Sequence, residues 1–162
     1  MEPRATRQLT FHGAVVTLVG LLAGIPYAMV ATERMPGSER AWRFAHAGNI
    51  LGGLVLIAVA GVADRLDLVP ARRSLLVWSL VLGAYADALG IIAAATFDVR
   101  GLIPGGSLAN TVVYVLLAIG AAGALAGMAL LALGHAPQGM RRASARRPGC
   151  GRARRRGGAP RA

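Results

Sequence analysis

The chain alternates between long apolar stretches and short polar connections that are rich in turn-forming residues. Four stretches are long enough to cross a hydrocarbon core, which needs about 20 apolar residues in a helix rising about 1.5 Å per residue. They are residues 11–31, 45–63, 75–96 and 108–133. Because the bilayer holds no water to satisfy backbone groups, each stretch must be helical. The pattern predicts an all-α fold, an integral membrane four-helix bundle formed by residues 1–136.

The composition agrees with this fold class and excludes an ordinary soluble domain. Of the 162 residues, 55% are hydrophobic and only 15% are charged, and the length allows no more than one domain. The predicted connections are residues 32–44, residues 64–74 and the turn-rich crossing "FDVRGLIPGGS" before the fourth helix.

The distribution of arginine predicts the topology. All 18 basic residues are arginines; 14 lie toward the N-terminus, the second connection and the C-terminal tail, and 4 lie in the first and third connections. Since basic residues near helix ends are retained on the cytoplasmic side, both termini should be cytoplasmic.

Residues 137–162 form an Arg- and Gly-rich tail with almost no large apolar side chain. Such a segment should be disordered. Its charge fits anionic lipid headgroups, or it only enforces orientation; a specific nucleic-acid partner is the weaker alternative. The single cysteine, Cys150, lies in this tail, which excludes an intramolecular disulfide and a cysteine-based metal site.

Glycines recur at four-residue spacing within the predicted helices. Such pairs let helix backbones approach closely, so tight packing is their ordinary explanation. In the second helix, the missing side chains could instead admit a flat cofactor. The pairs are Gly20 and Gly24, Gly48 and Gly52, and Gly123 and Gly127.

Few polar side chains fall inside the predicted spans, and such residues usually have a functional or structural reason. They are His12, His46, Asn49, Tyr85, Asp87 and Tyr114. His12 begins the first helix on one side and His46 begins the second on the other. Across a core about 30 Å thick, these two histidines cannot hold one metal within a protomer. The chain therefore offers a single axial histidine.

The spacing of the polar residues suggests a pocket in the outer half of the membrane. Asp87 lies about 18 Å along the third helix and shares a face with Ile91. His46, Asn49, Ile50 and Gly53 share a face of the second helix. We expect these two faces to wall the site. The alternatives are that His46 only caps its helix and that Asp87 is a neutral hydrogen-bonding group between helices.

The segment "MPGSERAWRFAHAGNILGGLVLIAVA" resembles the styrene oxide isomerase family of small bacterial membrane enzymes with four helices. The resemblance extends without gaps from Pro36 to about Leu102, and the first helix adds His12-Gly13. The connection after that helix is shorter here than in the family. The positions that carry it are Pro36-Gly37-Ser38, Trp42, Ala45-His46, Gly48, Gly53 and Ile57-Ala58-Val59-Ala60.

The resemblance implies a haem b, bound between the subunits of a homo-trimer, with His46 as the iron ligand. Ferric haem would act as a Lewis acid on an epoxide oxygen, giving a carbonyl product. Gly48, Gly52, Gly53 and Ile91 would then line the cofactor.

This chain departs from the family pattern at the positions that contact the substrate. The family's active-site Asn falls at Gly52, and its active-site Tyr falls at Ile91. Asp87 replaces a further family Asn, and Tyr85 replaces a Trp. Asn49 lies three residues before the lost Asn and about 60° around the helix, so it is no direct substitute. The candidate catalytic residues are Asp87, Tyr85 and Asn49.

The resemblance therefore implies a haem b-dependent isomerase in a bacterial inner membrane, converting a small apolar epoxide to an aldehyde or ketone with altered specificity. Two alternatives remain: a haem protein of the same architecture for redox or gas sensing, and a structural or lipid-binding protein without a cofactor.

Overall fold

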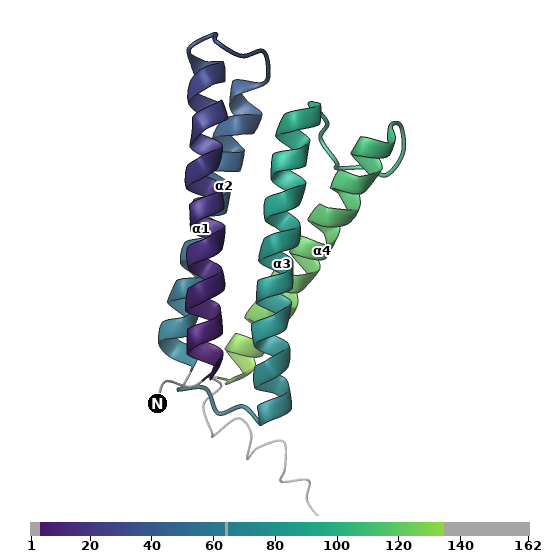
Figure 1. Cartoon of the computed structure of the whole chain (residues 1–162). Helices are drawn as coiled ribbons and strands as arrows, with labels where there is room; N and C mark the ends of the chain where they lie inside the picture. Colours follow the sequence, from purple (N-terminus) through teal and green to yellow (C-terminus); the bar gives the residue numbers. More distant parts are fainter. Residues whose placement is uncertain (1–3, 64, 135–162) are drawn as a thin grey trace, which may run out of the picture.

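A computed structural model describes residues 4–63 and 65–134, which form four helices and, within those ranges, no strand (Figure 1). The helices are α1 (Arg4–Ala31), α2 (Glu39–Ala63), α3 (Pro70–Phe97) and α4 (Leu108–Gly134). All four are long and apolar enough to cross a membrane. The predicted all-α fold class is confirmed, whereas the predicted tail, residues 137–162, lies outside the described residues.

Three helices begin earlier than the sequence analysis placed them. The predicted starts were residues 11, 45 and 75, and the observed starts are Arg4, Glu39 and Pro70. An apolar stretch marks only the part of a helix that suits hydrocarbon, whereas the helix itself continues through polar turns. Local signals explain two of the starts, since the Ser38 hydroxyl accepts the N–H of Ala41 at 3.3 Å and a proline opens α3.

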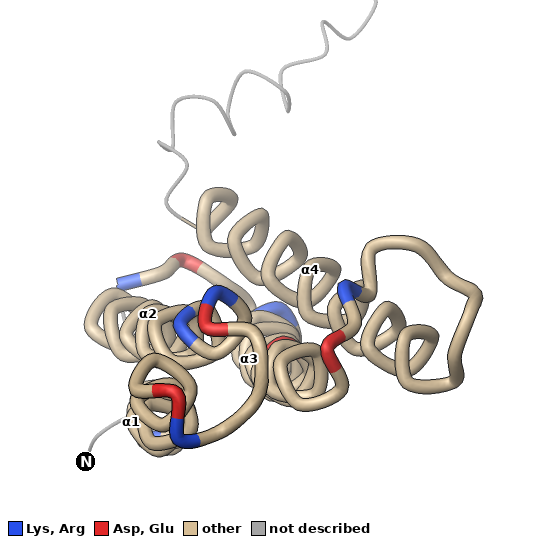
Figure 2. The backbone as a smooth tube through the Cα atoms, turned by 90° about the horizontal axis from the view of Figure 1, so that it is seen from above, with Lys and Arg blue, Asp and Glu red and all other residues tan. Residues whose placement is uncertain are grey.

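The helices associate as two pairs rather than as a closed square. α1 packs along α2, α3 packs along α4, and α3 also contacts α1 and α2. The end-on view shows α4 beside α3 and apart from α1 (Figure 2). Within the described residues α4 makes no helix contact with α1 or α2, so most of its apolar surface is open to lipid.

Glycines bring the helices of each pair together. A Cβ added at Gly20 would lie 2.6 Å from the backbone nitrogen of Ile50, and one added at Gly123 would lie 2.5 Å from the carbonyl oxygen of Ser79. No side chain fits in either place. The prediction that these glycines serve close helix packing is confirmed.

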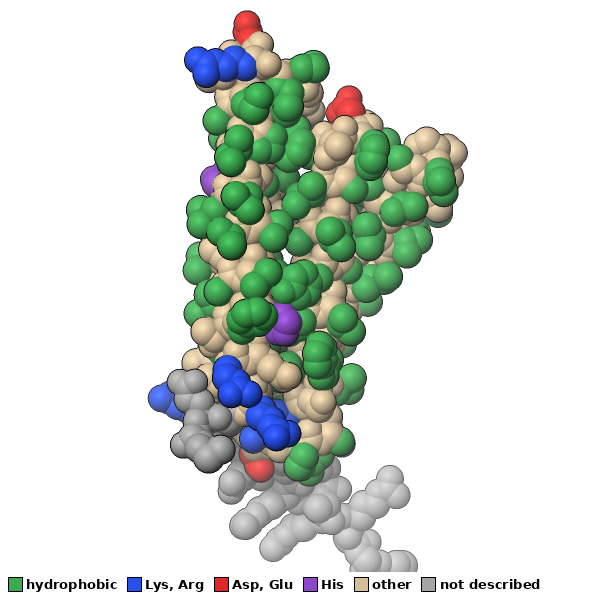
Figure 3. All heavy atoms as spheres, in the orientation of Figure 1, with side chains coloured by type: hydrophobic (Ala, Val, Ile, Leu, Met, Phe, Trp, Pro, Cys, Tyr) green, Lys and Arg blue, Asp and Glu red, His purple; other side chains and the backbone are tan. Residues whose placement is uncertain are grey.

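The buried core differs between the two ends of the molecule. The end that carries the N-terminus is filled by large side chains, among them Leu9, Leu56 and Leu76. Toward the α1–α2 connection, the buried cluster is Ala23, Ala45, Ile91 and Ala95. Apolar side chains cover the surface between the charged ends (Figure 3), as a membrane-spanning protein requires.

Candidate functional site

His46 lies in the third turn of α2, and its half-buried ring rests against α1. Its Nδ1 lies 2.9 Å from the carbonyl oxygen of Gly20, and the ring of Tyr27 stacks on it with the centroids 6.1 Å apart and the planes 14° apart. Because a carbonyl oxygen can only accept, Nδ1 donates the hydrogen. The lone pair of the neutral ring is therefore on Nε2, the arrangement found in metal-bound histidines.

Gly24 makes this position of the ring possible. A Cβ added there would lie 2.9 Å from Nδ1 and 3.1 Å from Cε1 of His46. Any larger residue would push the ring away from the Gly20 carbonyl. The two glycines of the first helix thus serve different purposes. Gly20 allows the α2 backbone to approach α1, and Gly24 leaves space for the ring of His46.

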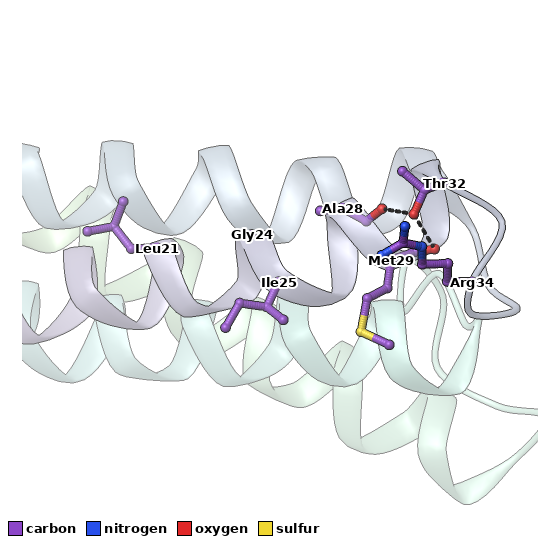
Figure 4. Close-up of a pocket in the computed structure, with 7 residues that line it drawn as sticks. All are labelled: Leu21, Gly24, Ile25, Ala28, Met29, Thr32 and Arg34. Carbon is purple, nitrogen blue, oxygen red and sulfur yellow. Dashed lines mark hydrogen bonds between the residues drawn. The ribbon is translucent and has the colours of Figure 1, made fainter.

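An open hollow of about 450 Å³ runs along α1 beside this contact. We call it the α1 hollow. Gly24 is the lining residue whose added Cβ would meet the His46 ring, whereas His46 itself does not line the hollow. The hollow is an open depression whose lining residues all belong to α1 and the turn that ends it, and the lining is apolar except at the connection end (Figure 4). The lining residues are Leu21, Gly24, Ile25, Ala28, Met29, Thr32 and Arg34.

The packing of α2 on α1 contradicts the predicted pocket between the second and third helices. His46, Ile50 and Gly53 share a face, as predicted, but that face is turned to α1. A Cβ added at Gly53 would lie 2.5 Å from the carbonyl oxygen of Gly13. Gly53 therefore serves the α1–α2 contact, and its predicted contact with a cofactor stays a prediction.

Gly48 and Gly52 lie on the side of α2 nearer α3. A Cβ at Gly48 would lie 3.7 Å from Cδ1 of Ile91, whereas one at Gly52 would meet no atom within 4 Å. Ile91 is buried in the small cluster with Ala23 and Ala45. Contacts of these three residues with a cofactor stay predictions, and Gly52 is the position with free space.

Asn49 is the buried polar residue of α2, with 2% of its surface exposed. Its Nδ2 has no hydrogen-bond partner within the described part of the chain. The acceptor for the His46 ring is the backbone carbonyl of Gly20 and not the side chain of Asn49. A catalytic contact of Asn49 stays a prediction.

Asp87 and Tyr85 do not face His46 on α2. Asp87 faces α4, and Tyr85 contacts His12 on α1. A Cβ added at Gly120 of α4 would lie 2.9 Å from Cβ and 3.1 Å from Oδ1 of Asp87, so this carboxyl is turned to α4. The hydroxyl of Tyr85 lies 3.0 Å from Nδ1 of His12 on α1. Close packing of α3 on α4 sets this rotation. The prediction that the face of Asp87 lines a site with His46 is wrong, and the predicted catalytic roles of Asp87 and Tyr85 remain untested.

The sequence analysis missed Tyr27 and Arg34. Tyr27 lies three residues after Gly24, on the face that Gly20 and Gly24 also share, so helical spacing could have found it. Arg34 was counted only for topology, because its place beside the hollow depends on the turn that ends α1.

Comparison with known families matches residues 5–136 to the family described as styrene oxide isomerase. The match includes all four helices and His46. Comparison with curated proteins gives no match.

Proposed function

We propose, from the premise that this chain belongs to the styrene oxide isomerase family, that it is a haem b-dependent membrane isomerase converting a small apolar epoxide to an aldehyde or ketone. Family membership supports isomerase chemistry of the styrene oxide type. The observation that carries the haem assignment is the hydrogen bond from Nδ1 of His46 to the Gly20 carbonyl, 2.9 Å long.

The residues around His46 fit a haem. Nε2 of a neutral imidazole is a common iron ligand, and its second nitrogen is already held by a backbone carbonyl, which fixes the tautomer and the ring orientation. The α1 hollow beside Gly24 offers an apolar flank. His46 is half-buried, and in the homo-trimer that the resemblance implies, a second copy of the chain would cover the opposite flank of the cofactor.

The chain's own residues would hold the cofactor, orient it and exclude water. When bound, ferric haem supplies a Lewis-acid position that polarises the epoxide C–O bond. Apolar side chains of α1, together with the surrounding lipid or a second copy of the chain, would keep water away from the carbon centre that becomes electron-poor as this bond breaks. A 1,2-hydride shift then gives the carbonyl product without net oxidation or reduction.

The test combines a spectrum with product analysis. Protein purified in detergent after expression with haem supplied should show a Soret band and convert an aryl epoxide to the carbonyl isomer. His46→Ala should lose both signals and His12→Ala should keep them. A wild-type protein without a Soret band would contradict the proposal.

A second candidate, haem binding without isomerisation, is favoured by one observation. Where the family has a tyrosine, the chain has Ile91, which is buried in an apolar cluster; where it has an asparagine, Gly52 leaves open space. Neither can hydrogen-bond a substrate through a side chain. A full Soret band with no product from a panel of aryl and alkyl epoxides would favour this second function.

A further inference from the structure

The two connections at one end of the molecule differ in their exposed side chains. The α1–α2 connection carries the charged residues Glu33 and Arg34, both exposed. The α3–α4 connection, residues 98–107, instead exposes Leu102 and Ile103, with 73% and 75% of their surfaces accessible. Large apolar side chains on a helix connection are costly in water, because water must then cover their apolar surface.

The surroundings of the α3–α4 connection are free of charge on the side of α4. No acidic or basic residue occurs from Gly101 to Gly134. In Figure 1 the connection turns back from the end of α3 toward the middle of the molecule, whereas the α1–α2 connection stands further out. In the end-on view it extends to the side of the bundle, away from α1 and α2 (Figure 2). Leu108, the first residue of α4, is also exposed, so the apolar surface continues from the connection onto α4.

The side chain of Asn110 satisfies the backbone of this connection from within the protein. Its Oδ1 accepts the N–H of Gly101 at 3.0 Å. Its Nδ2 donates to the carbonyl oxygens of Ile103, at 2.8 Å, and Gly105, at 2.9 Å. In lipid, where water is lacking, non-helical backbone groups need partners of this kind. One side chain thus replaces water for three backbone groups.

The connection is also held against the start of α4. Gly101 is buried and left-handed, with φ 59°, and a Cβ added there would clash with Cγ1 of Val113. The Ser107 hydroxyl accepts the N–H of Asn110 at 3.2 Å, which caps the first turn of α4. These contacts fix the backbone in a shape that leaves the Leu102 and Ile103 side chains on the outside.

We propose that the α3–α4 connection lies in lipid at the membrane boundary, with Leu102 and Ile103 inserted among the acyl chains. The partner of this surface is the bilayer, at the level where apolar side chains meet the headgroups. Asp98 and Arg100, which precede the apolar residues, are exposed and lie at the headgroups. This inference does not depend on haem binding or on isomerisation.

The experiment attaches the fluorophore NBD to single cysteines of the full chain in a Cys150→Ser background. The labelled variants are Ile103→Cys and Leu102→Cys, with Arg34→Cys as the control in the charged connection and Leu125→Cys, exposed on α4, as the control in lipid. Each protein is reconstituted in phosphatidylcholine vesicles. Quenching is measured with phosphatidylcholine spin-labelled near the headgroup or near the chain end, and with iodide on both sides of the membrane. Circular dichroism checks that each variant remains helical.

The label at Ile103→Cys and at Leu102→Cys should lose fluorescence to the lipid labelled near the headgroup and be unaffected by iodide. At Leu125→Cys the lipid labelled near the chain end should quench more strongly, and at Arg34→Cys iodide should quench. Adding Asn110→Ala to Ile103→Cys should reduce lipid quenching and allow iodide quenching, because the freed backbone groups then seek water. Lipid quenching that is unchanged by Asn110→Ala would contradict the role of Asn110.

Two results would overturn the inference itself. Quenching of the label at Ile103→Cys and Leu102→Cys by iodide, as at Arg34→Cys, would place the connection in water. Protection from iodide and from both spin-labelled lipids would show that protein, such as a second copy of the chain, covers the connection instead of lipid. Neither result would change the haem proposal, which is tested by the Soret band.

Discussion

The two histidines of the described chain are alike in several respects but differ in one decisive contact. Both are half-buried on membrane-spanning helices, and each has Nδ1 near an oxygen, at 2.9 Å for His46 and 3.0 Å for His12. For His46 the oxygen is a backbone carbonyl, which only accepts. For His12 it is the Tyr85 hydroxyl, which can donate or accept. The first contact fixes the tautomer and exposes a lone pair on Nε2, whereas the second leaves the tautomer free.

Their surroundings differ in the same sense. His46 lies against Gly24, which lines the α1 hollow, and one aromatic ring, that of Tyr27, stacks on it. His12 lies among aromatic rings, with centroid distances of 5.2 Å to Phe11, 6.4 Å to Trp78 and 5.6 Å to Tyr85. The hollow that His12 itself lines is smaller, about 220 Å³. Aromatic side chains therefore surround His12 more closely than His46, whose ring position instead depends on Gly24.

The largest effect is expected when each histidine is replaced by glycine and imidazole is added to restore haem binding. His46→Gly should lose nearly all haem, and added imidazole should restore a Soret band because it replaces the missing side chain as iron ligand. His12→Gly should keep its haem, and imidazole should not be needed. Absorption spectra with and without imidazole measure both. Loss of haem from His12→Gly with retention in His46→Gly would reverse the assignment.

The next largest effect is expected from a change in the hydrogen bond that holds the His46 ring, with His46 itself left in place. Gly24→Ala adds a Cβ 2.9 Å from Nδ1, so the ring must move away from the Gly20 carbonyl. Loss of such a supporting hydrogen bond typically lowers metal affinity by about 10- to 100-fold, and we expect a change in this range for haem.

Gly52→Ala is the matched control, because a Cβ there meets no protein atom within 4 Å. Haem affinity, measured by titration of apoprotein, should stay at the wild-type value in this variant. A loss confined to Gly52→Ala would instead place the cofactor on the side of α2 that faces α3, as the resemblance to the family implied.

A smaller effect is expected at the His12 end. Tyr85→Phe removes the hydroxyl that lies 3.0 Å from Nδ1 of His12, which should cost about 1 kcal/mol of stability and leave the haem spectrum unchanged. Thermal unfolding in detergent measures the stability. A double-mutant cycle with His12→Ala should show coupling between the two positions, and additive effects would contradict a direct hydrogen bond.

The smallest effect is expected at Asn49. Its Nδ2 is buried without a partner within the described residues, so Asn49→Leu removes an unsatisfied polar group at similar volume. The variant should be as stable as wild type or slightly more stable, within about 1 kcal/mol. A clear loss of stability or of turnover would show that Asn49 has a partner in the membrane, such as a substrate or a second subunit.

The sequence by itself determined the four helices, their membrane-spanning length and the use of Gly20, Gly24 and Gly123 in close packing. These follow from local physics, since apolar length and four-residue spacing are properties of one helix. His46 was also found from sequence, but only with the help of a family resemblance, because a lone histidine at a helix start has commoner explanations.

The tertiary structure alone decided which helix each face meets. Periodicity gives angles between residues on one helix, but it does not give the rotation of that helix against its neighbours. For this reason the face of His46 and Gly53 was assigned to the third helix and lies on α1, while Asp87 lies against α4 and Tyr85 against His12. The carbonyl that fixes the His46 tautomer is 26 residues away in the chain, so only the packing of α1 on α2 could reveal it.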